Sequence, residues 1–173
     1  PPRPGGPGRT LGGVKVLVSQ PLPEPSTTEI LEGFEVVVGR SGAWEEEALL
    51  HLPDADALVP TPREKVTEAL VALAPRLRVV ANCAVGTDNV DLDACRRHGV
   101  VVTNTPGVLT DATADLAWLL VLAVARRLRE GEALLRSGTW SGWKPLELLG
   151  TSLAGKTLGV YGMGRIGNAV ARR

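Results

Sequence analysis

The stretch Thr157-Leu-Gly-Val-Tyr-Gly-Met-Gly-Arg-Ile-Gly-Asn-Ala-Val-Ala171 decides the fold. Its first five residues are mostly apolar or β-branched and predict a strand, and its alanine-rich end predicts the start of a helix. Between them, Gly162, Gly164 and Gly167 have the G-x-G-x-x-G spacing of a dinucleotide-binding βαβ unit. A structural turn without a ligand is the alternative, but the flanking strand and helix favour cofactor binding.

Each glycine is expected to have a separate role in such a turn. Gly162 allows a tight turn after the strand, Gly164 lets the backbone approach a pyrophosphate, and Gly167 lets the helix lie close to the sheet. The N–H groups of Arg165 and Ile166 are then expected to face the phosphates from the positive end of the helix. The acidic residue that holds the ribose is expected about twenty residues further on, so residues 1–173 do not distinguish NAD from NADP.

Upstream of this stretch, short apolar runs alternate with helical patterns. Such runs, separated by helices, predict a parallel sheet covered on both faces, and hence an α/β fold. The predicted strands span 14–19, 34–38, 56–59, 78–82 and 100–103, and the predicted helices span 26–31, 45–52, 61–73, 91–98 and 110–125. Capping boxes are expected to begin the helices at 26 and 61, and Thr110 or Asp111 is expected to cap the last one.

A second candidate site is the segment Asn82-Cys-Ala-Val-Gly-Thr-Asp88, which follows the strand predicted at 78–82. Open α/β sheets place their ligands at the carboxyl ends of strands. The small residues of 84–86 leave backbone N–H groups uncovered, and such groups can hold a carboxylate. The alternative is an ordinary β-to-α connection in which Asp88 or Asp91 caps the next helix, and the spacing alone does not decide between the two.

Two of the four tryptophans lie in Trp140-Ser-Gly-Trp143-Lys-Pro145, within a loop predicted over 138–150. Large aromatic side chains on a loop more often anchor an interface than catalyse a reaction. A contact between subunits is therefore the favoured interpretation, and packing within the chain is the alternative.

The composition gives little reason to expect a charged partner. The 19 basic and 19 acidic residues balance, so nothing favours nucleic acid or an anionic membrane. The longest apolar run, at 116–125, is too short to span a bilayer. The two cysteines form no C-x-x-C pair and indicate reduced thiols in a cytoplasmic protein. Cys83 is predicted to be a packed side chain, both histidines are expected at the surface or as caps, and no metal site is predicted.

Taken in order, these motifs resemble the D-isomer-specific 2-hydroxyacid dehydrogenase family. The resemblance rests on residues 78–91, 101–115, 138–145 and 153–167, and the Trp-x-x-Trp-Lys-Pro segment is similar to the glyoxylate/hydroxypyruvate reductase branch. It implies a flavodoxin-like substrate domain over 13–104, after a leader at 1–12 that is expected to be disordered. Residues 105–173 would then hold a linker helix, a Trp-rich dimerisation loop and the start of an incomplete Rossmann NAD(P)-binding domain.

The resemblance also implies roles for particular residues. Backbone N–H groups that match Val85 and Gly86 hold the substrate carboxylate, and the turn from Gly162 to Gly167 holds the pyrophosphate. Thr110 matches the segment near the nicotinamide, and Trp143 matches a loop tryptophan that reaches toward the partner subunit's active site in a homodimer. The family's catalytic Arg, Glu and His match no position in this sequence, so no catalytic residue is assigned and the chain alone is expected to be inactive.

The implied reaction is NAD(P)H-dependent reduction of a small 2-oxo acid, such as glyoxylate or hydroxypyruvate, to the 2-hydroxy acid. Two alternatives remain open. Another 2-hydroxyacid dehydrogenase, such as phosphoglycerate dehydrogenase, shares the loop and the glycine turn, and a nucleotide-sensing corepressor shares the fold. The neutral charge and the Trp-Lys-Pro segment favour the metabolic enzyme.

Overall fold

The computed structural model describes residues 13–25, 27 and 29–173. The chain divides into two compact units, Pro1–Pro106 and Gly107–Arg173. The leader predicted at 1–12 lies outside the described residues. No helix in the described part of the chain is long and apolar enough to cross a membrane.

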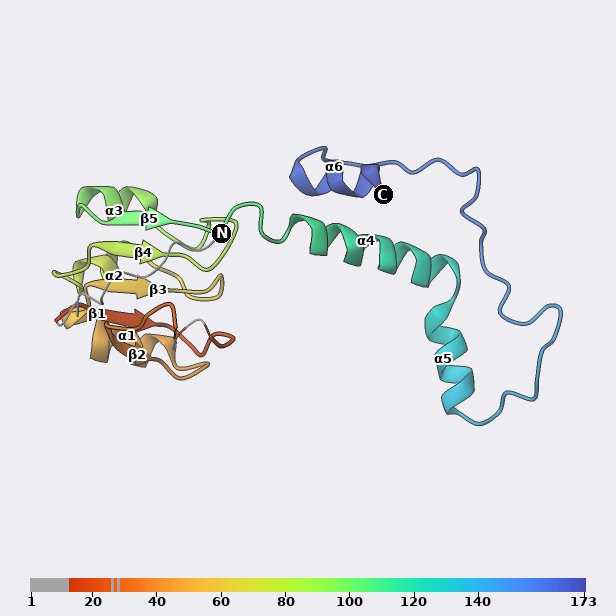
Figure 1. Cartoon of the computed structure of the whole chain (residues 1–173), viewed down its shortest axis with the longest axis horizontal. Helices are drawn as coiled ribbons and strands as arrows, with labels where there is room; N and C mark the ends of the chain where they lie inside the picture. The colour runs from red at the N-terminus through yellow and green to blue at the C-terminus, as the bar shows by residue number, and fades with distance from the viewer. Residues whose placement is uncertain (1–12, 26, 28) are drawn as a thin grey trace. The chain divides into compact units, whose positions relative to one another are not determined.

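The first unit is built on a five-stranded parallel sheet with the strand order β2-β1-β3-β4-β5 (Figure 1). This is the doubly wound order of flavodoxin-like folds, so the predicted fold class is confirmed. All five predicted strands are present, and each is one or two residues shorter than predicted. The strands are β1 (Lys15–Val18), β2 (Glu35–Val38), β3 (Ala57–Val59), β4 (Val79–Ala81) and β5 (Val101–Thr103).

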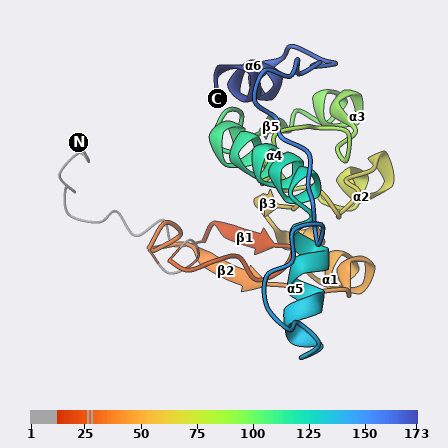
Figure 2. The same cartoon turned by 90° about the vertical axis from the view of Figure 1, so that its right-hand side faces the viewer.

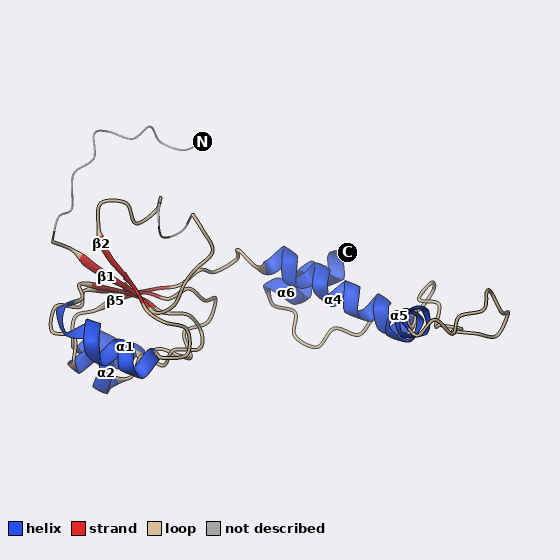
Figure 3. Cartoon of the chain, turned by 90° about the horizontal axis from the view of Figure 1, so that it is seen from below, coloured by secondary structure: helices blue, strands red, loops and turns tan. Residues whose placement is uncertain are grey.

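The core of this unit forms around β1 because that strand lies between two others and is buried along most of its length. Leu17 and Val18 are fully buried, and Leu17 belongs to a cluster that includes Leu58 of β3 and Val80 of β4. Helices α1 (Trp44–His51) and α2 (Glu68–Ala72) lie on one face of the sheet (Figure 3). A 3-10 helix, η1 (Leu52–Asp54), follows α1 directly. Successive residues of a strand point to opposite faces, and Val16, Leu17 and Val18 are all buried, so β1 is covered on both faces as a parallel sheet requires.

The helix predicted over 61–73 is wrong in its first half. The capping contact exists, since Glu64 Oε2 accepts a hydrogen bond from the Thr61 N–H at 2.7 Å. However, Val66 forms an isolated parallel bridge with Val90, and this bridge keeps the chain extended at that point. The helix therefore begins only after Thr67, whose hydroxyl accepts a bond from the Leu70 N–H.

Two other predicted helices of this unit have different outcomes. Helix α3 (Leu92–Arg97) is confirmed: the Asp91 carboxylate caps its start, and Gly99 follows its end with a φ of +71°. The helix predicted at 26–31 is not formed among the described residues there, which make hydrogen-bonded turns. Ser26 and Thr28 of its predicted capping box lie outside the described residues.

The second unit contains three helices: α4 (Thr110–Ala125), α5 (Leu128–Arg136) and α6 (Arg165–Arg172). Helices α4 and α6 lie side by side (Figure 2), with Ala114 and Ala169 fully buried. The Trp118 indole N–H also donates a hydrogen bond to the Val170 carbonyl at 2.9 Å. Helix α5 was not predicted, because four of its nine residues are charged, one is glycine, and no capping side chain begins it.

Two local predictions for this unit are wrong. Leu109 occupies the N-cap of α4 and makes no side-chain cap, Thr110 is the first helical residue, and the Asp111 carboxylate pairs with Arg173. No strand forms over 157–161, because the described residues offer that segment no strand partner. The helix predicted after the glycine turn is confirmed as α6.

Candidate functional site

Polar side chains gather at the carboxyl edge of the sheet, where Ser19 follows β1 and Thr61 follows β3. Both donate hydrogen bonds to one oxygen of the buried Glu64 carboxylate, at 2.9 Å from Ser19 Oγ and 2.6 Å from Thr61 Oγ1. With the Thr61 N–H, three donors surround Glu64 Oε2. The buried negative charge is thereby compensated by hydrogen bonds, as burial of a carboxylate requires.

Next to this cluster, Asn82 and Asn89 form a reciprocal pair of buried amides. Each Nδ2 donates to the other Oδ1, at 2.9 and 3.0 Å, and the two residues are 1% and 4% exposed. Asn89 Nδ2 also lies 3.1 Å from the Thr61 carbonyl and 3.2 Å from that of Glu64. The pair therefore links the segment after β3 to the segment after β4. No sequence motif identifies either side chain as part of this network.

The segment after β4 carries the candidate carboxylate site. Val85 and Gly86 are exposed, and within the described residues neither of their N–H groups donates a hydrogen bond. A Cβ added to Gly86 would lie 2.7 Å from Oδ1 of the exposed Asp88 side chain, which is able to move aside, so packing does not by itself require glycine there. Asp91 does cap the next helix, as the alternative interpretation expects, but it bonds the Ala94 N–H and leaves those two N–H groups free. Uncovered backbone donors of this kind bind anions.

The two cysteines differ in environment. Cys83 is exposed beside this segment, so its predicted packing is wrong. Cys95 of α3 is fully buried, and its burial raises the pKa of the thiol. Within the described residues, no group of three metal-binding side chains is present.

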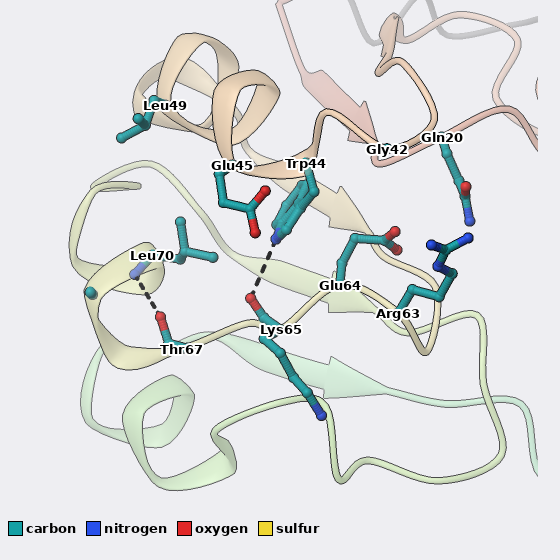
Figure 4. A pocket seen from close by; sticks show the side chains of 11 residues that line it. Gln20, Gly42, Trp44, Glu45, Leu49, Arg63, Glu64, Lys65, Thr67 and Leu70 are labelled. Carbon is teal, nitrogen blue, oxygen red and sulfur yellow. Dashed lines mark hydrogen bonds between the residues drawn. The ribbon is translucent and has the colours of Figure 1, made fainter.

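A cavity of about 540 Å³ lies between α1 and the segment 63–70 (Figure 4). Gln20 and Arg63 line one end, and Leu49 and Leu70 line the other. The Trp44 indole forms part of its wall and donates a long hydrogen bond to the Lys65 carbonyl. No sequence motif predicted this cavity, because its lining comes from several separate segments.

The glycine turn of the second unit has the expected local geometry. Gly162 has a φ of +97°, and a Cβ at Gly167 would collide with the Gly162 carbonyl. In contrast, a Cβ at Gly164 would meet nothing within 4 Å. Within the described residues, the N–H groups of Arg165 and Ile166 have no acceptor. The turn thus leaves open space and free donors at the N-terminus of α6, which suits a phosphate.

Asn168 is a residue of this turn that the sequence analysis missed. Its Nδ2 donates to the carbonyls of Met163 and Gly164, at 2.6 and 3.0 Å. It therefore holds the chain that leads into α6. Only its place one residue after the last glycine could have identified it.

The remaining predicted site residues also lie in the second unit. Thr110 is partly buried at the start of α4. Trp143 is 83% exposed, whereas Trp140 lines a hollow of about 490 Å³ with residues of α5 such as Leu128 and Leu135. Val85 and Gly86 belong to the first unit, so the candidate carboxylate site and the glycine turn lie in different units of the chain.

Comparison with known proteins identifies the family. Residues 16–168 match the family described as D-isomer specific 2-hydroxyacid dehydrogenase, catalytic domain. The chain is 45% identical over 170 residues to a glyoxylate reductase of Thermococcus onnurineus, covering 92% of this chain and 49% of the relative. It therefore spans about half the length of the curated relatives it matches.

Solved structures agree with this result. A protein from Thermus thermophilus is 46% identical, with a TM-score of 0.88 and coverage of 92% of this chain and 52% of the other. An NADPH-dependent glyoxylate/hydroxypyruvate reductase from Sinorhizobium meliloti, in complex with NADP and malonate, is 36% identical. Its TM-score is 0.74, with 92% of this chain and 49% of that one covered. The chain belongs to the D-isomer specific 2-hydroxyacid dehydrogenase family.

Proposed function

We propose that this chain supplies the carboxylate site and part of the cofactor site of an NAD(P)H-dependent reductase of small 2-oxo acids, glyoxylate or hydroxypyruvate. The observation that carries the proposal is the pair of unpaired N–H groups at Val85 and Gly86, exposed at the carboxyl end of β4. The names of the glyoxylate reductase relatives support this substrate class over a phosphorylated one.

In this proposal the two N–H groups bind and orient the substrate. A carboxylate that accepts hydrogen bonds from Val85 and Gly86 is fixed at one end, so its neighbouring carbonyl takes a defined direction. Backbone donors lose almost no conformational freedom on binding, because the fold already holds them in place. Neither donor titrates in the neutral range, so this contribution to binding does not depend on a side-chain pKa.

The glycine turn fits a dinucleotide. The open space at Gly164 admits a phosphate to the backbone, and the N–H groups of Arg165 and Ile166 are free to bind its oxygens. The nicotinamide cofactor, NAD or NADP, supplies the hydride when it is bound. Thr110 is assigned to the segment near the nicotinamide ring. No residue of 1–173 is assigned as a proton donor, and we expect the 173-residue chain alone to bind ligands without turnover.

A homodimer is the further proposal for the tryptophan loop. Trp143 is exposed on a loop and is free to contact a second copy, where it would extend toward the partner subunit's substrate. Trp140 is half-exposed against α5 and is expected to support the loop. A cytoplasmic location is proposed from the cysteine content alone.

A binding experiment tests the proposed function directly. The ¹⁵N-labelled chain is titrated with oxamate, a stable analogue of a 2-oxo acid, and separately with NADH and NADPH. We expect oxamate to shift the amide signals of Val85 and Gly86, and the dinucleotides to shift those of 162–167. If oxamate leaves both amides unchanged while the rest of the spectrum shows a folded chain, the proposed substrate site is wrong. Tighter binding of 3-phosphohydroxypyruvate than of hydroxypyruvate would favour a phosphoglycerate dehydrogenase.

A further inference from the structure

Three consecutive carbonyl groups in the segment after β4 are each held by a donor from elsewhere in the first unit. The Ala84 carbonyl accepts a hydrogen bond from the Thr105 N–H at 2.8 Å. The Val85 carbonyl accepts one from Asn104 Nδ2 at 2.7 Å, and the Gly86 carbonyl accepts one from Asn82 Nδ2 at 3.0 Å.

Because the peptide bond is planar, a hydrogen bond that fixes a carbonyl also fixes the direction of the N–H in the same peptide unit. In a trans peptide unit, the C=O and the N–H point in opposite directions. The units that contain the three carbonyls also contain the N–H groups of Val85, Gly86 and Thr87, respectively. Each N–H must therefore point away from the donor that holds its own carbonyl.

All three N–H groups are unpaired in the described part of the chain. Successive backbone N–H groups that lack an internal acceptor carry partial positive charge, and groups of this kind bind anions. The third donor, at Thr87, follows from this geometry and from no sequence motif.

We propose that Asn104 and Asn82 are positioning residues that orient a three-donor cradle, formed by the N–H groups of Val85, Gly86 and Thr87, for the substrate carboxylate. The inference rests on the proposed function, because it deepens the assignment of the same site. Asn104 follows β5, and its side chain donates to the Val85 carbonyl. Without that bond, the peptide unit between Val85 and Gly86 is free to rotate, and the Gly86 N–H loses its fixed direction.

Asn82 is itself held in place by its partner. Its amide is shared between the Gly86 carbonyl and Asn89, and Asn89 is anchored to the segment after β3. The cradle is therefore connected to the buried part of the sheet edge on one side and to the segment after β5 on the other. Asn104 is the better residue to change, because it is exposed and the core does not depend on it.

Oxalate binding to the ¹⁵N-labelled 173-residue chain tests the proposal. In the unaltered chain, oxalate should shift the amide signals of Val85, Gly86 and Thr87 together with one dissociation constant. Asn104→Ala should raise that constant about fivefold, the effect of losing roughly one hydrogen bond's contribution to orientation. Asn104→Gln keeps a donor and should recover part of the loss. Thr105→Ala is the matched control, because it keeps the backbone N–H that bonds Ala84, and it should bind oxalate as the unaltered chain does.

The outcomes separate this inference from the function on which it rests. If oxalate shifts the Val85 and Gly86 amides but Asn104→Ala binds it equally well, or if Thr87 does not respond, the positioning role is wrong and the substrate site stands. If none of the three amides responds, both fail. If Asn104→Ala does not fold, the scalar coupling across the hydrogen bond from Asn104 Nδ2 to the Val85 carbonyl is measured in the unaltered chain. A coupling that is present both without and with oxalate supports the positioning role. A coupling that appears or disappears when oxalate is added contradicts it.

Discussion

Gly164 and Gly167 have different surroundings although both belong to the same turn. Gly167 lies against the Gly162 carbonyl, with the Val160 side chain nearby, whereas the space around Gly164 is empty. Glycine at 167 is therefore required by the protein's own packing. Glycine at 164 leaves room that a ligand is proposed to fill.

Alanine substitutions at these two positions should therefore affect different properties: stability at Gly167 and cofactor binding at Gly164. Gly167→Ala must displace backbone, and we expect it to destabilise the contact of α6 with α4 by about 1–3 kcal/mol, the usual cost of overpacking. Gly164→Ala should leave stability nearly unchanged, because its φ of −74° is ordinary for alanine, and should weaken NADH binding. Urea unfolding monitored at Trp118, whose indole bonds α6, measures the first effect, and NADH titration measures the second. Equal stability of the two variants would contradict this account.

At the scale of elements, the sequence correctly predicted the helices and strands whose formation depends only on the local residue pattern. The strands were found because a parallel sheet needs short runs that are apolar on both faces, and all five have that pattern. The helix start at Thr61 was misplaced because its capping signal is real but local. The bridge between Val66 and Val90 joins residues far apart in the sequence, and it prevents the helix from starting there.

The same distinction applies to the candidate site. The segment 84–86 was singled out because small residues after a predicted strand are a local signal, and the family resemblance then named Val85 and Gly86 within it. Asn104 was missed because its partner, the Val85 carbonyl, is 19 residues away in the sequence. The strand at 157–161 was wrongly predicted for a related reason. An apolar, β-branched pattern favours an extended conformation, but a strand also needs a neighbouring strand to pair with, and the pattern does not show whether one is present.

Asp56, immediately before β3, bonds residues of two other segments, and its carboxylate should make the stability of the first unit depend on pH. Its carboxylate accepts the Lys15 N–H of β1 at 2.9 Å and pairs with Arg76, which precedes β4. The Lys15 backbone bond, followed by Arg76, lowers the pKa of Asp56 below its ordinary value of 3.8. The lowered pKa means that the charged form contributes stability at neutral pH, and this contribution is lost as the pH falls below about 4.

We therefore expect Asp56→Asn to lower the urea midpoint at pH 7 and to have a smaller effect near pH 3. Asp93→Asn is the control, because Asp93 pairs with Arg96, both side chains of that pair are exposed, and such pairs contribute little. Urea unfolding of both variants at the two pH values measures the difference. An Asp56→Asn effect that is the same at pH 7 and pH 3 would show that the carboxylate charge does not stabilise this junction.

At the scale of the whole molecule, the two units differ in how much apolar surface they bury. The first contains a connected core of leucine, valine and other apolar side chains around β1, β3 and β4. In the second, the only buried apolar residues among those described are Ala114 and Ala169. Leu120 of α4, Trp143 and Tyr161 are all exposed there. Local stability follows buried contacts, so the two units should not have the same resistance to opening.

Amide hydrogen exchange of the 173-residue chain should reveal this difference. We expect the slowest exchange in β1, β3 and β4, intermediate exchange where α4 and α6 meet, and rapid exchange over 157–161. That last segment has an apolar pattern but no backbone partner among the described residues, so its N–H groups are open to water. Slow exchange there at low protein concentration would contradict the expectation. Protection that appears only as the concentration rises would instead mean that a second copy supplies the missing strand partner.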